Sequence, residues 1–230
     1  MSRLLTLTLC LLVLFGALHV AVPANQHHDV RLMDYAVNRI AVIGDSYTSG
    51  SDEGGAGTKG WPTRVWRSLA HQGIAVTPTV AAEPGAGYGT RGDRGSLFED
   101  LTVRAVKPND VLVVFFGSHN DLHVDDLTRL SVVMYGTLRL ARQIARSAKF
   151  LVIGPAWPNA DPPLAIRRIR DVLSYQAKLA KANFVDPLAA RWFAGTSDLI
   201  SEDGIHPTDA GHAYMAQKLA PLIGAQLNPY

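Results

Sequence analysis

The sequence predicts an α/β fold, a three-layer α/β/α sandwich around a five-stranded parallel sheet. From about residue 38 onward, short runs rich in β-branched residues alternate with longer stretches of helical periodicity. This order is typical of a parallel sheet covered by helices on both faces. One short run, residues 111–116, is almost wholly apolar, as expected of a strand buried on both sides.

The first half of the chain supplies three strands and one helix. Residues 40–43 form a β-branched run that stops at Gly44, which predicts the first strand. A helix is expected over residues 61–72, because Pro62 lies in its first turn and Gly73 follows its end. The second and third strands are expected at residues 74–80 and 111–116.

The second half supplies the remaining elements. Apolar side chains recur at helical spacing over residues 126–149, with arginines between them, which predicts a long amphipathic helix. Residues 150–153 then predict a fourth strand that ends at Gly154. The last elements are expected to be a helix over residues 164–182, a strand at residues 184–185, and a helix over residues 210–227 capped by Thr208 or Asp209.

The first 24 residues are expected to be an export segment outside the fold. Arg3 precedes an apolar stretch over residues 4–22, and the small residues ending at Ala24 suit signal-peptidase cleavage before residue 25. An uncleaved membrane anchor is the alternative, because the apolar stretch is long enough to span a bilayer. In either case we expect a secreted or cell-envelope protein. The only cysteine, Cys10, lies in this segment.

The length and composition of the chain fit one globular domain. We place this domain at residues 38–230, after a short extension over residues 25–37. The chain of 230 residues is 47% hydrophobic and 18% charged, which suits a single core. Its 22 basic and 20 acidic residues form no basic stripe. We therefore expect no nucleic-acid partner. We also expect a monomer.

Ser46 and His206 are the residues that indicate catalysis. A strand that turns sharply at Gly44 would place Ser46 at the tip of the sheet with its own N–H free to face an anion. Asp203 lies three residues before His206, so it could hold one ring nitrogen while the other takes the Ser46 proton. Taken separately, each segment also reads as an ordinary polar turn.

Four segments in order resemble the conserved blocks of the SGNH, or GDSL, hydrolases. Gly44-Asp-Ser-Tyr-Thr-Ser-Gly50 resembles the first block and Asp203-Gly-Ile-His206 the last. Val80-Ala-Ala-Glu-Pro-Gly85 and Gly117-Ser-His-Asn-Asp121 resemble the two blocks between them. The third block carries one residue more than the common pattern, His119, and Val80 stands where the second block often has asparagine.

This resemblance implies a flavodoxin-like SGNH-hydrolase fold and a serine esterase that needs no metal or cofactor. Ser46 would be the nucleophile, His206 the base and Asp203 the group that orients it. The oxyanion hole would comprise the Ser46 N–H, the Gly85 N–H and the Asn120 side-chain amide. Gly87 competes with Gly85 for the second of these positions.

Two further sets of residues carry weaker expectations. Trp157, after the fourth strand, is the tryptophan expected to touch substrate. His119, His123 and Asp121 resemble half a metal site, but no helical His-Glu-x-x-His context exists and no metal is expected. His212, on the last helix, is expected at the surface or as a capping residue.

We therefore predict an exported esterase acting on a small-molecule or envelope ester. No apolar lid helix follows the export segment, and the loops after the first two strands are glycine-rich. An open cleft would favour acetyl to hexanoyl esters over palmitoyl esters. The alternatives are a cell-envelope O-acyltransferase that uses the same acyl-enzyme, and a non-catalytic binding domain on the same fold.

Overall fold

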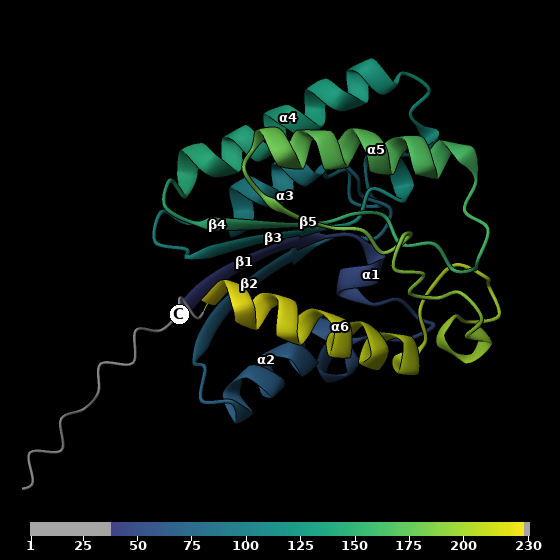
Figure 1. Cartoon of the computed structure of the whole chain (residues 1–230), viewed down its shortest axis with the longest axis horizontal. Helices are drawn as coiled ribbons and strands as arrows, with labels where there is room; N and C mark the ends of the chain where they lie inside the picture. Colours follow the sequence, from purple (N-terminus) through teal and green to yellow (C-terminus); the bar gives the residue numbers. More distant parts are fainter. Residues whose placement is uncertain (1–37, 228–230) are drawn as a thin grey trace, which may run out of the picture. The chain divides into compact units, whose positions relative to one another are not determined.

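The computed structural model describes residues 38–227 of the chain, and within them a five-stranded parallel sheet forms the centre (Figure 1). Its order is β2-β1-β3-β4-β5, which confirms the predicted fold class. The strands are β1 (Asn38–Gly44), β2 (Val76–Ala82), β3 (Leu112–Phe116), β4 (Lys149–Ile153) and β5 (Asn183–Val185). Because β1 has β2 on one side and β3 on the other, the chain reverses its winding direction at β1, where ligands bind in open α/β sheets.

Helices cover both faces of the sheet. In Figure 1, α2 (Trp61–His71) and α6 (Asp209–Leu227) lie below it, while α3 (Phe98–Ala105), α4 (Leu127–Ile144) and α5 (Leu164–Leu179) lie above it. The shorter helical segments are α1 (Ser46–Ser49), η1 (Gly57–Lys59), η2 (Asn120–His123) and η3 (Ser197–Leu199).

Alternate side chains of each central strand enter two separate hydrophobic cores. In β1, Ala41 and Ile43 pack with the α3, α4 and α5 face, whereas Ile40 and Val42 pack with the α2 and α6 face. All four side chains are fully buried. This period of two follows from the pleat of a strand, and it explains why residues 40–43 of β1 and 112–116 of β3 are apolar at every position.

The structure contains every predicted strand and long helix, with corrections at their ends. The second strand begins at Val76 and not at residue 74, and α4 and α5 end at Ile144 and Leu179, earlier than expected. The helix α3 was missed. Phe98, Leu101, Thr102 and Ala105 give it a buried face at helical spacing, and Asp100 accepts a hydrogen bond from the Leu97 N–H at 2.9 Å.

The predicted export segment (residues 1–24), the predicted extension over residues 25–37 and the last three residues of the chain lie outside the described residues. Among the helices of residues 38–227, none combines the length and apolar character needed to cross a membrane.

Candidate active site

The turn from β1 into α1 places Ser46 at the carboxyl end of the central strand. A Cβ on Gly44 would overlap the Thr48 side chain, so only glycine permits this turn. Asp45 caps α1 by accepting a hydrogen bond from the Tyr47 N–H at 2.9 Å. Asp45 therefore has a structural role at this turn, and Ser46 occupies the first helical position with 7% of its surface exposed.

The loop before α6 holds His206 against Asp203. The Asp203 Oδ2 atom lies 2.6 Å from His206 Nδ1. Tyr47 donates a hydrogen bond to the Ile205 carbonyl at 2.6 Å, which ties this loop to the helix that carries Ser46. The imidazole thus has one nitrogen fixed by a carboxylate and the other left for a second partner.

The Asp203 carboxylate is held in its ionised form. Burial by itself would raise its pKa, but hydrogen bonds from the Ser201 hydroxyl, the His206 ring and the N–H groups of His206 and Ile205 outweigh that effect. Together they hold the pKa of Asp203 well below its usual range. An ionised Asp203 orients His206 and stabilises its protonated form.

Gly85, and not Gly87, has the geometry of an oxyanion donor. The Gly87 N–H donates to the Thr90 carbonyl at 2.8 Å. Within the described residues, the N–H groups of Gly85 and Ser46 have no such acceptor, and both residues line the same cavity. Gly85 has φ +74°, a backbone conformation that residues other than glycine adopt only at a cost in free energy.

Asn120 lies beside these donors at the start of η2. Its Nδ2 atom donates to the Ala86 carbonyl at 2.8 Å and lies 3.4 Å from Asp45 Oδ2. The second contact is long, so one amide N–H is only weakly held. The pKa of Asp45 is raised to about 7, mainly because the carboxyl is buried. The hydrogen bond from the Tyr47 N–H offsets part of this increase, and the nearby charge of Asp121 adds to it.

Two buried carboxylates hold the loop that carries Gly85. Asp121 accepts hydrogen bonds from the N–H groups of Tyr88, Gly89 and Thr90 at 2.8–3.1 Å, and from the Ser118 hydroxyl at 2.7 Å. Glu83 accepts from the N–H groups of residues 94 and 96 at 2.7 and 3.0 Å. The glycine-rich loop is therefore fixed in its middle by Asp121 and at its end by Glu83.

A cavity of about 510 Å³ gathers most of the predicted site residues. Ser46, His206, Gly85 and Asn120 all line it, and Asp203 reaches it through His206. The cavity therefore combines a hydroxyl, an imidazole oriented by a carboxylate, and free N–H donors. Such a set can carry out nucleophilic attack on a carbonyl and stabilise the resulting oxyanion.

Trp157 lies next to this cavity without lining it. Its ring packs against that of His119, with centroids 4.9 Å apart, and His119 does line the cavity. Burial, and then the proximity of His206 and His123, lower the pKa of His119 to about 4. His119 is thus a neutral wall residue of the site, a role that was not predicted from the sequence, where His119 was noted as the extra residue of the third block and as part of half a metal site.

The expectation for His212 was wrong, because its side chain is fully buried. Its ring packs on Gly55, its Nδ1 atom accepts from the Trp61 N–H at 3.4 Å, and burial lowers its pKa to about 4. Thr208, not Asp209, caps α6, since its hydroxyl accepts from the Gly211 N–H at 3.1 Å. Within residues 38–227, no three His, Cys, Asp or Glu side chains gather in a way that could hold a metal ion.

Comparison with known proteins supports one family. Residues 42–214 match the model of the GDSL-like lipase/acylhydrolase family. Over 197 residues the chain is 55% identical to GDSL lipase Rv0518 of Mycobacterium tuberculosis, which covers 85% of each protein.

Solved structures share the fold. The crystal structure of TesA matches with a TM-score of 0.67 and 22% identity, covering 83% of this chain and all of TesA. The psychrotrophic esterase EstA from Pseudoalteromonas sp., solved inhibited by monoethylphosphonate, matches with a TM-score of 0.64 and 15% identity, covering 84% of this chain and all of EstA.

Proposed function

The chain belongs to the GDSL-like lipase/acylhydrolase family and is a serine hydrolase that acts on ester bonds, and we propose that Ser46, His206 and Asp203 are its catalytic triad. The observation that carries this proposal is the 2.6 Å contact between Asp203 and His206 at the rim of a cavity that also contains Ser46. If Asp203 only capped a turn and His206 were only a surface residue, the two would not need to meet beside a cavity that contains Ser46.

In this mechanism, Ser46 Oγ attacks the ester carbonyl carbon while His206 Nε2 removes the hydroxyl proton. The tetrahedral intermediate collapses when His206 gives that proton to the leaving alcohol, which forms an acyl-enzyme on Ser46. Water then attacks the acyl-enzyme with His206 again as base, and the carboxylic acid leaves. Asp203 stays ionised throughout and stabilises the imidazolium.

The oxyanion is held by the N–H groups of Ser46 and Gly85 and by the weakly held Asn120 amide N–H. The assignment of the two backbone donors is supported by the fact that neither N–H has an acceptor among the described residues. Donors fixed in advance stabilise developing charge without reorganisation, and each typically contributes about 10²–10³ in turnover.

The substrate we propose is an ester with a short acyl chain, acetyl to hexanoyl. The loops around the cavity, residues 51–60 and 84–95, are glycine-rich, and the apolar helices of residues 38–227 are used in the two cores. An open site gains little from each added CH₂, whereas a tunnel would gain about 0.8 kcal/mol for each. The natural ester is then a small molecule or an acylated component of the cell envelope.

We also propose that the protein acts outside the cytoplasm. The support is the apolar segment over residues 4–22 with its small-residue cleavage site. Sequencing the amino terminus of protein from the native host should give a start near Asn25. Cytoplasmic protein that retains Met1 would contradict this proposal.

Hydrolysis of p-nitrophenyl butyrate by purified protein and its Ser46→Ala variant tests the triad, because the variant should retain no activity above background. Repeating the reaction with a sugar acceptor, and analysing the products, separates hydrolysis from acyl transfer. Free acid as the main product supports an esterase, and an acylated sugar would support the O-acyltransferase alternative.

A further inference from the structure

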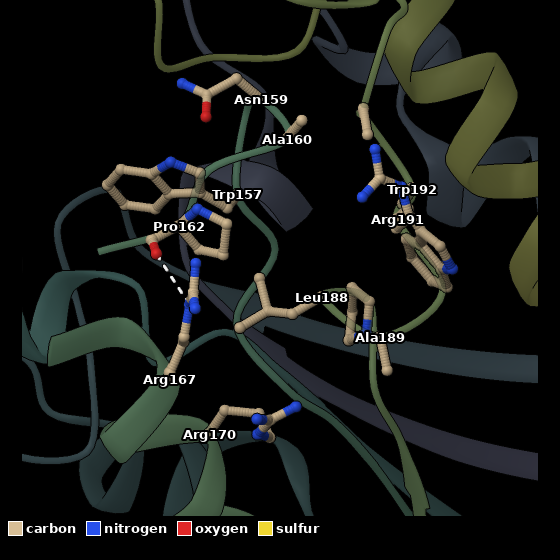
Figure 2. Close-up of a pocket in the computed structure, with 12 residues that line it drawn as sticks. Trp157, Asn159, Ala160, Pro162, Arg167, Arg170, Leu188, Ala189, Arg191 and Trp192 are labelled. Atoms are coloured by element: carbon tan, nitrogen blue, oxygen red, sulfur yellow. Dashed lines mark hydrogen bonds between the residues drawn. The ribbon is translucent and has the colours of Figure 1, made fainter. Parts of the chain in front are cut away.

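A second cavity of about 270 Å³ lies on the far side of Trp157, and we name it the Trp157 cavity. It lies between the segment after β4, the start of α5 and the segment after β5. In Figure 2, Trp157 and Pro162 form one side, Arg191 and Trp192 the opposite side, and Arg167 and Arg170 the base. The cavity is therefore walled by indole rings and guanidinium groups.

One aromatic pair separates the Trp157 cavity from the catalytic cavity. Trp157 packs against His119 with ring centroids 4.9 Å apart, and each ring lines one of the two cavities. A substrate whose ester lies at Ser46 could therefore extend past this pair. Because the two cavities lie on either side of this one aromatic pair, the Trp157 cavity is the candidate place to hold a group several bonds from the ester.

The charged side chains that line the Trp157 cavity are all basic, and carboxylates from outside the lining pair with two of them. Three arginines line it and no carboxylate does. Arg167 donates to the Pro162 carbonyl at 3.0 Å and to Asp161 at 3.2 Å, and the Asp161 side chain is 95% exposed. Such an exposed pair is weak, so it would yield readily to a better-placed anion.

Arg170 and Arg191 differ in how much of their binding capacity is free. Arg170 is paired with Asp171 and Asp186 through two of its nitrogens, which leaves its third nitrogen unused. Within the described residues, the Arg191 side chain makes no hydrogen bond or ion pair. Arg191 therefore offers a complete guanidinium fork to the cavity.

The backbone at Arg191 is strained in a way that favours a role for its side chain. Its φ is +50°, the left-handed region. Glycine or asparagine adopts this region more readily than arginine does. This turn is what brings the guanidinium to the side of the cavity facing Trp157 (Figure 2).

We propose that the Trp157 cavity is a subsite for a carboxylate or phosphate group that the ester substrate carries several bonds from the scissile bond. Guanidinium groups bind both anions through paired hydrogen bonds, and the indole faces would contact the carbon atoms beside the anion. This inference rests on the proposed function of Ser46, and it adds a class of substrate to it.

Paired esters test the subsite. The first series comprises phenyl monoesters of C4 to C8 dicarboxylic acids, and the second comprises acetyl esters of ω-hydroxy acids. Each ester is compared with its neutral methyl-ester counterpart at low salt. The wild-type protein should show kcat/KM about tenfold higher for the charged member in at least one series, as expected for charge-assisted hydrogen bonds at a partly exposed site.

Arg191→Gly should reduce this preference to near one while hydrolysis of the neutral esters is unchanged. Glycine suits the positive φ, so the fold should be retained, and a matching melting temperature will verify this. Arg167→Gln provides a second variant with the same expected loss. Arg168→Ala, on the same helix α5 but outside the cavity, is the matched control and should keep the full preference.

Inorganic phosphate separates a substrate subsite from a site for a free anion. It should inhibit hydrolysis of the preferred charged ester competitively and leave the neutral ester unaffected. If charged esters are not preferred in either series, or if the preference persists in both arginine variants, the subsite proposal is wrong, whether or not phosphate binds. Failure of the proposed catalysis would look different, because Ser46→Ala would then still hydrolyse the neutral esters.

Discussion

The two oxygens of the Asp203 carboxylate have different partners, and only Oδ2 contacts the His206 imidazole. The Oδ2 atom lies 2.6 Å from His206 Nδ1, while Oδ1 accepts hydrogen bonds from the Ser201 hydroxyl at 2.6 Å and from two backbone N–H groups at 2.8 and 2.9 Å. The carboxylate is thereby fixed in position before it acts on the imidazole.

Asp203→Asn should lower kcat by about 10⁴, less than Ser46→Ala or His206→Ala, because Asp203 orients the base and does not react. Ser201→Ala removes one hydrogen bond to Oδ1 and leaves Oδ2 free to hold His206. It should therefore lower kcat by no more than about tenfold. Steady-state kinetics on p-nitrophenyl butyrate measures kcat for Asp203→Asn and Ser201→Ala. Equal losses in these two variants would show that the two carboxylate oxygens do not have separate roles.

Asn120→Ala should lower kcat by about 10²–10³ with little change in KM, because the amide acts on the oxyanion and not on the bound ester. Its Ala86 contact is also lost, so the melting temperature must be measured alongside. Thr90→Val is the control, because it removes a hydroxyl that donates to the backbone carbonyl of Asn120 at 2.9 Å and leaves the Asn120 side-chain amide in place. A rise in KM alone would assign Asn120 to ground-state binding.

The loop that follows α1 depends on close packing against α6. A Cβ on Gly55, which has φ +78°, would overlap the His212 ring, whereas a Cβ on Gly57, with φ +57°, meets nothing within 4 Å. Gly55→Ala should therefore destabilise the fold by about 2–4 kcal/mol and Gly57→Ala by only about 1 kcal/mol. Urea denaturation measures both, and equal effects would mean that the loop can move away from His212.

Buried His212 should make the protein less stable in mild acid. Its pKa is about 4 in the fold and has an ordinary value of 6.5, so the unfolded chain binds a proton that the folded chain does not. Stability from this residue is therefore complete above pH 6.5 and is lost as the pH falls toward 4. Asp45 acts in the opposite sense, because burial raises its pKa to about 7.

The measurement is therefore a comparison of pH profiles. His212→Asn keeps an acceptor for the Trp61 N–H and removes the titration, so its unfolding free energy should fall less steeply between pH 6.5 and 4, by up to about 1.4 kcal/mol per pH unit. His71→Asn, at the exposed end of α2, is the control. Parallel profiles for His212→Asn and the wild type would exclude this role.

A series of p-nitrophenyl esters tests the short-chain proposal. The specificity constant kcat/KM should be highest between the acetyl and hexanoyl esters and lower for the palmitoyl ester, since an open cavity adds little apolar burial beyond the first few carbons. Values that climb steadily to the palmitoyl ester would reveal a buried acyl pocket and overturn the proposal.

Much of the fold was predictable because parallel strands leave a strong signal. Residues 112–116 are apolar at every position because both faces of β3 are buried. The helix α3 was harder, because its eight residues follow a long glycine-rich loop and its cap, Asp100, lies inside the helix. Phe98, Leu101 and Ala105 at helical spacing were the available signal.

The site was predictable only as far as local sequence determines geometry. Asp203 and His206 are three residues apart, so their contact could be expected from the chain itself. The choice between Gly85 and Gly87 could not, because it depends on the Thr90 carbonyl occupying the Gly87 N–H. Likewise, the burial of His212 depends on Gly55, which is 157 positions away in the chain and permits contact only because it lacks a side chain.

The central claim is that Ser46 is the activated nucleophile, and covalent labelling with a fluorophosphonate tests it most directly. Mass spectrometry of digested protein should place a single phosphonyl adduct on the peptide that contains Ser46. Labelling should disappear in Ser46→Ala and fall strongly in His206→Ala, with Ser49→Ala, on the same short helix, labelled like the wild type. An adduct on another residue, or undiminished labelling of Ser46→Ala, would contradict the account.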